Sequence, residues 1–106
     1  MMAWTYLLLA GLFEIGWPIG LKLGWSEGGL RPAWIVLALA CIVASGALLL
    51  LAQRTIPMGT AYAVWTGIGA AGAFIVGILA FGDAASTMRI LSAGLIVAGV
   101  VGLKFG

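Results

Sequence analysis

The stretch "LLLAGLFEIGWPIGLK", residues 7–22, decides the fold of this chain. Up to the closing lysine its side chains are apolar or glycine, with one exception, the carboxylate of Glu14. An ionised acid at the centre of a bilayer costs roughly 2.5 to 3.5 kcal/mol on insertion scales. The stretch therefore predicts a membrane-spanning helix, and Glu14 is the residue whose presence the function has to explain.

The composition of the 106 residues extends this prediction to the whole chain. It is 64% hydrophobic and 8% charged, whereas soluble domains carry roughly 25% charged residues, so a soluble fold of this length could not bury so much apolar surface. A spanning helix needs about 20 mostly apolar residues. We therefore expect an all-α membrane protein, a single transmembrane domain over residues 1–106 without a soluble part. Its four helices are expected near 3–22, 33–53, 58–80 and 86–105.

Short connections are expected between the four helices. Pro32 suits the first turn of the second helix, Pro57 suits the start of the third, and Ser86 or Thr87 can cap the fourth. Glycines in the first connection mark it as a loop. The three connections are 24–32, 54–58 and 81–87.

Charge and special residues exclude several classes of function. A net charge of +2 rests on five basic and three acidic side chains, too few to indicate nucleic-acid binding. The single cysteine, Cys41, cannot form an internal disulfide and is expected to pack as a small hydrophobe. "GIGAAG" (67–72) has the glycine spacing of a dinucleotide-binding turn, but no predicted strand precedes it. We expect it to allow a bend or a close helix contact instead, and we expect no cofactor and no metal.

The basic residues give little preference for one orientation in the membrane. With four spans, both termini and the 54–58 loop lie on one side, with Arg54 and Lys104, while Lys22, Arg31 and Arg89 lie on the other. Orientation follows the lysine and arginine bias between loops, and two against three is almost no bias. Either a weak signal suffices, or the chain inserts both ways and pairs head to foot.

Small residues recur every fourth position in the last span, at Gly94, Ala98 and Gly102. This spacing lets two helices approach closely. The stripe can serve packing within one chain, but four helices are too thin to enclose a pathway. We therefore expect a homodimer with these three residues at its interface.

Glu14 is the strongest candidate for function. Every lysine and arginine lies at a helix end, so none shares its depth. It can be a structural acid that holds a proton permanently. However, intramembrane acids typically mark ion or substrate pathways, and we expect Glu14 to bind a proton or a substrate cation.

Helical spacing selects the neighbours of Glu14 on its own helix. Gly11, Trp17 and Pro18 share its face. Trp17, one turn away, can border whatever binds the carboxylate; as an interfacial anchor it would lie too deep. Pro18 has no N–H and so leaves the Glu14 carbonyl without its helical donor. That creates either a free acceptor beside the acid or a simple packing kink.

The second and third spans supply further polar and aromatic side chains. Tyr62, Trp65 and Thr66 lie within about one turn and offer hydroxyls and ring faces, with core packing as the alternative role. Ser45 is the hydroxyl in the middle of the second span. It can join the site or bond back to its own helix.

The motifs "GLFEIGWPIGLK" (11–22) and "IPMGTAYAVWTGIGAAGA" (56–73) resemble those of the small multidrug resistance family. The resemblance covers the length, the spans and the loops, and it is closest to the guanidinium exporter subtype. Quaternary-ammonium exporters of the family tend to lack a tryptophan at the position of Trp17. They also tend to carry isoleucine and serine where this chain has Thr60 and Thr66. Pro18 departs from the small residue common in guanidinium exporters.

The resemblance implies an antiparallel, dual-topology homodimer in the bacterial inner membrane. It implies that Glu14 binds proton and substrate in competition, with Trp17, Ser45, Tyr62 and Trp65 lining the site. The expected function is proton-coupled export of guanidinium or small substituted guanidiniums, which is not enzymatic. Three alternatives remain: export of quaternary ammonium or other hydrophobic cations, one subunit of an obligate heterodimer, and a non-transporting membrane protein.

Overall fold

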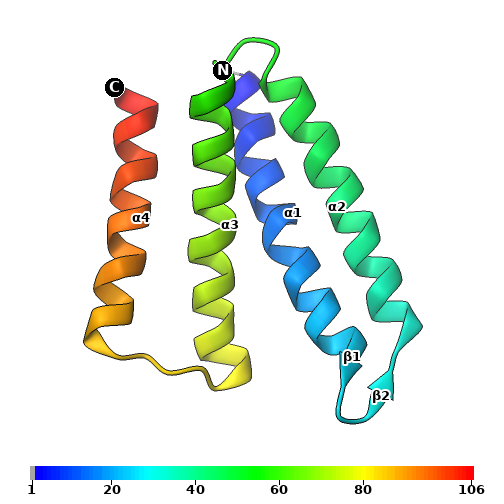
Figure 1. Ribbon diagram of the computed structural model, residues 1–106. Coiled ribbons are helices and arrows are strands. Elements are labelled where there is room, and N and C mark those ends of the chain that lie inside the picture. The colour runs from blue at the N-terminus through cyan, green and yellow to red at the C-terminus, as the bar shows by residue number, and fades with distance from the viewer. Residues whose placement is uncertain (1) are drawn as a thin grey trace.

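The structure, a computed structural model, describes residues 2–106 as four long helices and one short hairpin (Figure 1). All four helices are long and apolar enough to cross a membrane, which confirms the predicted helical membrane architecture. They agree with the predicted spans to within two residues at each end. The bounds are α1 Met2–Gly24, β1 Trp25–Ser26, β2 Gly29–Leu30, α2 Pro32–Ala52, α3 Met58–Phe81 and α4 Thr87–Phe105.

The helix ends use the residues that the sequence marks for them. Pro32 occupies the first turn of α2, and Pro57 directly precedes α3. Of the two candidate caps of α4, the cap is Ser86, whose hydroxyl accepts a 3.3 Å hydrogen bond from the backbone N–H of Arg89. Gly82 ends α3 with φ 70°, a left-handed conformation that favours glycine.

The first connection is more ordered than the loop that the sequence predicts. Trp25 pairs with Leu30, and Ser26 with Gly29, in a two-stranded antiparallel ladder. Gly29 has φ 96°, which a side chain would disfavour. The glycines that mark the segment as a loop thus form the turn of a hairpin that extends beyond α1 and α2 (Figure 1).

Helix α1 is the centre of the packing and lies between α2 and α3 (Figure 1). Glycines on α1 set its distance to α2, because a Cβ at Gly16 would lie 2.8 Å from Cys41 Sγ and one at Gly20 would lie 2.9 Å from the Ala38 Cβ. Helices α2 and α3 touch each other far less than each touches α1. They are joined by a hydrogen bond from Trp65 of α3 to Ser45 of α2.

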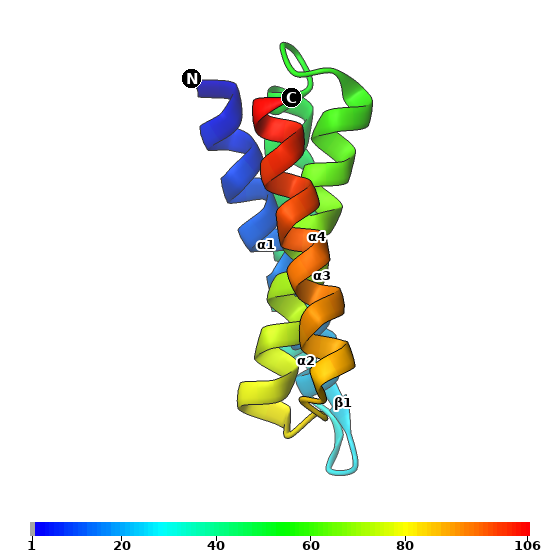
Figure 2. The ribbon, with the colours of Figure 1, turned by 90° about the vertical axis from the view of Figure 1, so that its left-hand side faces the viewer.

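The chain forms a thin layer of helices, 45 × 34 × 17 Å (Figure 2). The helices follow one another in a row, because α2 contacts α1, α1 contacts α3 and α3 contacts α4. A single chain cannot enclose a pathway across the membrane within such a layer.

Helix α4 lies at the edge of the layer and contacts α3. Val100 crosses α3 at Gly67, where a Cβ would lie 2.5 Å from Val100 Cγ2. Every residue of α4 is at least partly exposed. A Cβ at Gly94 or Gly102 would meet no atom of residues 2–106 within 4 Å. Within residues 2–106, Gly94 and Gly102 therefore do not serve a close contact with another helix.

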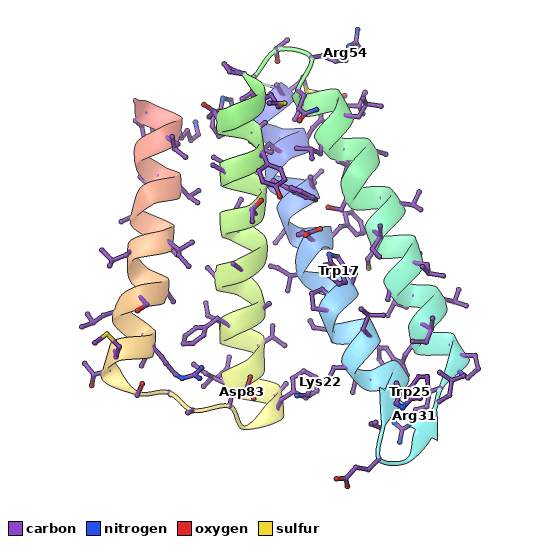
Figure 3. The ribbon with its side chains drawn as sticks, in the orientation of Figure 1. Trp17, Lys22, Trp25, Arg31, Arg54 and Asp83 are labelled. Carbon is purple, nitrogen blue, oxygen red and sulfur yellow. The ribbon has the colours of Figure 1, made fainter. Side chains whose placement is uncertain are left out.

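The two ends of the layer carry the charges that the sequence assigns to them. The start of α1, the end of α4 and the α2–α3 loop lie together at one end (Figure 1), with Arg54 in that loop (Figure 3). Lys22 and Arg31 lie at the opposite end, beside the hairpin (Figure 3). The middle of the layer holds one acidic side chain, Glu14.

Candidate functional site

Ser45 of α2 joins three helices at the level of Glu14. Its side chain is fully buried. Its Oγ lies 2.8 Å from the Ala10 carbonyl and 3.4 Å from Glu14 Oε1, and it accepts a 2.7 Å hydrogen bond from Trp65 Nε1. Ser45 belongs to α2, whereas Ala10 and Glu14 belong to α1. The alternative that the Ser45 hydroxyl bonds back to its own helix is therefore wrong.

The single hydroxyl proton of Ser45 has two possible acceptors. The shorter contact is with Ala10 O, at 2.8 Å, and the longer one is with the Glu14 carboxylate, at 3.4 Å. A serine oxygen has two acceptor positions, and Trp65 fills one of them. Ser45 can therefore donate to an ionised Glu14 or accept from a protonated one.

Aromatic rings of α3 adjoin this network. The rings of Tyr62 and Trp65 lie with their centroids 5.4 Å apart at an interplanar angle of 53°, within the range of favourable aromatic pairs. Trp65 is half-buried and bonded to Ser45, while Tyr62 remains 56% exposed. The structure thus brings Trp65 to the carboxylate through Ser45, and Tyr62 through its contact with Trp65.

The glycine-rich segment of α3 makes close helix contacts and does not break the helix. A Cβ at Gly69 would lie 2.6 Å from Glu14 Cγ, so the stem of Glu14 crosses α3 where α3 has no side chain. Gly72 receives Ile15 in the same way, and Gly67 receives Val100. Of the two interpretations of this segment, the close contact is confirmed, because α3 is continuous from Met58 to Phe81.

Two other candidate residues lie beside the network without joining it. Gly11 is buried against Ile68, whose Cγ2 would lie 2.7 Å from a Cβ at that position. Gly11 therefore sets the distance between α1 and α3 one turn before Glu14. Thr66 is exposed, and its hydroxyl donates a 2.7 Å hydrogen bond to the carbonyl of Tyr62 in its own helix.

Trp17 and Pro18 lie about one turn after Glu14 and are half-buried. Figure 3 shows Trp17 midway along α1, far from both ends of the layer, at a depth unlike that of an interfacial anchor. Pro18 lines a crevice of about 100 Å³ between α1 and α3, together with Ala73 and Val76. Helix α1 runs through Pro18 without a break.

Glu14 has no ion-pair partner within residues 2–106, and its side chain is half-buried. The two lysines of the chain are engaged elsewhere: Lys22 Nζ lies 5.0 Å from the centroid of the Phe81 ring, and Lys104 Nζ lies 4.9 Å from that of Trp4. The carboxylate of Glu14 lies between Gly69 of α3 and Ser45 of α2. It is placed to bind a proton or a small cation from outside the chain.

Two parts of this arrangement are absent from the predicted site. The acceptor at Ala10 is a backbone carbonyl, which no side-chain pattern reveals. Gly69 supports the stem of Glu14, and its signal is present in "GIGAAG" as an unusual density of glycines. Such density indicates a close contact without naming the partner.

Comparisons with known proteins agree with this architecture. The family described as "Small Multidrug Resistance protein" matches residues 2–96. Proteins named "Guanidinium exporter" from Citrobacter freundii and Salmonella typhimurium are each 54% identical over 103 residues, covering 97% of this chain and 96% of the relative. One from Yersinia pseudotuberculosis is 52% identical, with 97% of both chains covered. The chain belongs to the small multidrug resistance family, as a multi-pass protein of the bacterial inner membrane.

Proposed function

We propose that this protein is a proton-coupled antiporter that exports guanidinium or small substituted guanidinium cations. The observation that carries the proposal is a half-buried carboxylate, Glu14, held beside Ser45 and Trp65 in mid-membrane without a cation partner among residues 2–106. The name "Guanidinium exporter" of relatives 52–54% identical over nearly their whole length supports it.

The site suits guanidinium chemically. Guanidinium is planar, and its N–H groups form a fork that matches the two oxygens of a carboxylate. It also stacks on aromatic faces. Glu14 would bind the fork, while Trp17, Trp65 and Tyr62 would border the plane of the ion.

Coupling follows from competition for one carboxylate. Glu14 binds either a proton or the cation, so binding of one releases the other. Ser45 can donate to the ionised form and accept from the protonated form, which suits both states of the cycle. The inward proton gradient then drives the cation out. No covalent bond changes in this cycle, so the activity is transport and not enzymatic catalysis.

The proposal includes an antiparallel homodimer. A layer 17 Å thick cannot surround a substrate alone. The near-even distribution of basic residues over the two ends permits both orientations. Gly94, Ala98 and Gly102 offer a face for close helix contact. Two Glu14 carboxylates would then share the midplane, and opposed protomers would exchange conformations to give alternating access.

Gly11, Pro18 and Thr66 would shape the site geometry. Gly11 holds α1 close to α3, and Thr66 is bonded to the carbonyl of Tyr62. Pro18 removes the helical donor to the Glu14 carbonyl. The free carbonyl would offer a second acceptor for substrate N–H groups next to the carboxylate.

The test is a substrate panel in proteoliposomes containing this chain alone, with pH read on both sides of the membrane. Guanidinium moving against protons, abolished by Glu14→Gln, supports the proposal. Transport of a tetraalkylammonium but not guanidinium would indicate the quaternary-ammonium type and overturn it. No transport by correctly folded protein would indicate an obligate heterodimer. Unchanged coupled transport by Glu14→Gln would exclude Glu14 as the binding residue.

A further inference from the structure

The crevice between α1 and α3 reaches the end of the layer that carries the hairpin, where Lys22 and Asp83 lie (Figure 3). Its volume is about 100 Å³. Its inner end lies one turn beyond the crossing of Glu14 and Gly69, since Pro18 follows Glu14, and Ala73 follows Gly69, by four residues. We call it the α1–α3 crevice; its walls include Pro18, Lys22, Ala73, Gly77, Phe81 and Asp83.

Small residues of α3 keep the crevice open. Gly69, Ala73 and Gly77 recur every four residues along the part of α3 that meets α1. At Gly69 the two helices touch, because the stem of Glu14 fills the space there. From Ala73 outward, the small side chains leave space between the helices unfilled. The outer part of α1 therefore has room to move towards α3.

Opposite charges line the outer end of the crevice without pairing. Lys22 of α1 and Asp83 of the α3–α4 connection are the charged residues of its lining among residues 2–106, and they form no ion pair within 4.0 Å. The Lys22 ammonium lies instead 5.0 Å from the centre of the Phe81 ring. The Asp83 carboxylate lies against Gly77, and the backbone N–H of Asp83 donates a 3.0 Å hydrogen bond to the Gly77 carbonyl. Both charged groups thus contact the last two turns of α3.

We propose that Lys22 and Asp83 form a latch that closes the α1–α3 crevice during the transport cycle. As α1 moves towards α3, the Lys22 ammonium leaves the Phe81 ring and donates a charge-assisted hydrogen bond to the Asp83 carboxylate. Arg89, the next basic residue along the chain, does not line the crevice. Glu14 contacts α3 along the same seam, so closing the crevice also changes how the acid meets α3. The latch rests on the proposed function, because alternating access requires two conformations of the chain.

The experiment is crosslinking of the wild-type protein in liposomes with a water-soluble carbodiimide, which joins an amine to a carboxylate in direct contact. Mass spectrometry of the digested protein then locates the new amide bonds. We expect an amide between Lys22 and Asp83, at a yield well above that between Lys22 and Glu27. Glu27 is the matched control, because it is exposed in the hairpin turn, closer to Lys22 in sequence, and does not line the crevice. No amide to Asp83, or equal yields for the two acids, would overturn the proposal.

A variant of the crevice wall tests whether the helices must approach. Ala73→Leu fills the α1–α3 crevice while Lys22 and Asp83 keep their charges, and we expect it to lower the yield of their crosslink. Ala70→Leu is its control, since Ala70 is exposed on the same helix and lies outside the crevice. An unchanged yield in Ala73→Leu would show that the two side chains meet without closing the crevice and would overturn the latch.

Transport connects the latch to the cycle. The carbodiimide should inhibit guanidinium transport by the wild type in proportion to the crosslinked fraction, whereas Asp83→Asn, which cannot form the amide, should lose no activity on treatment. Equal inhibition of Asp83→Asn would overturn the role of the latch in transport. Formation of the crosslink needs no substrate. A chain that crosslinks but does not carry guanidinium would therefore count against the proposed function and not against the contact of Lys22 with Asp83.

Discussion

The side chain of Glu14 crosses α3 directly over Gly69, where a methyl group would lie 2.6 Å from Glu14 Cγ and 3.3 Å from Glu14 Cβ. Ser45 approaches the same carboxylate from α2. The acid is therefore held between a glycine that admits its stem and a hydroxyl that meets its oxygen. Its position depends on the close packing of three helices.

Gly69→Ala is expected to disable transport. The added methyl group cannot coexist with the present stem of Glu14, so either the acid moves or α1 and α3 separate. Overpacking of this kind costs about 1–3 kcal/mol, and we expect the guanidinium transport rate in proteoliposomes to fall by about tenfold or more.

Gly59→Ala is the control for this variant. Gly59 lies in the same helix, and a Cβ there meets no atom within 4 Å among residues 2–106. Alanine also favours the helix over glycine, so Gly59→Ala should transport like the wild type with equal or higher thermal stability. Wild-type rates from Gly69→Ala would show that the crossing does not position Glu14.

Ser45→Ala is expected to weaken guanidinium binding about tenfold. It leaves Trp65 Nε1 without its acceptor and removes the donor beside Glu14, and a buried unsatisfied group costs about 1–3 kcal/mol. Isothermal titration of the purified protein measures the loss. The same change at Ser92, whose hydroxyl is back-bonded within α4, should leave affinity unchanged. Equal affinity in the two variants would remove Ser45 from the site.

The architecture was open to prediction because the bilayer imposes it. Four apolar stretches of about 20 residues leave little freedom in helix number, and prolines and a serine mark the helix starts. Depth along a helix also follows from position in the sequence. That is why Glu14 stands out as a mid-membrane acid without a neighbouring cation.

Contacts between helices were less open to prediction. The alternation of Gly67, Gly69 and Gly72 indicates close approach, but only the packed structure pairs them with Val100, Glu14 and Ile15. The sequence favours neither role of Ser45, since a serine in a helix can donate to a carbonyl of its own helix or bond to a neighbouring helix. The distance between α1 and α2 decides between them, and this distance depends on glycines of α1 that face α2.

Guanidinium binding is expected to release protons from Glu14. In weakly buffered detergent solution, adding guanidinium to the wild type should acidify the medium, and the apparent Kd should rise as pH falls, because protons occupy the same carboxylate. Glu14→Gln should neither bind guanidinium nor release protons. Glu27→Gln is the matched control, since Glu27 is exposed in the turn between β1 and β2 and should behave like the wild type. Proton release that persists in Glu14→Gln would place the titrating group elsewhere.

Gly94→Leu and Gly102→Leu are expected to disrupt the proposed dimer. A Cβ at either position would meet no atom within 4 Å among residues 2–106, so a leucine there should leave the fold of the protomer intact. Against a second α4, however, it would prevent the close approach that small residues allow. Crosslinking of the protein in liposomes should show a large drop in the dimer fraction, with loss of transport in parallel. Ser92→Leu is the control for Gly94→Leu, because it adds bulk about 160° around α4 from Gly94 at 100° per residue, and it should keep the dimer. If both glycine variants dimerise and transport like the wild type, the partner must pack on another face of the protomer.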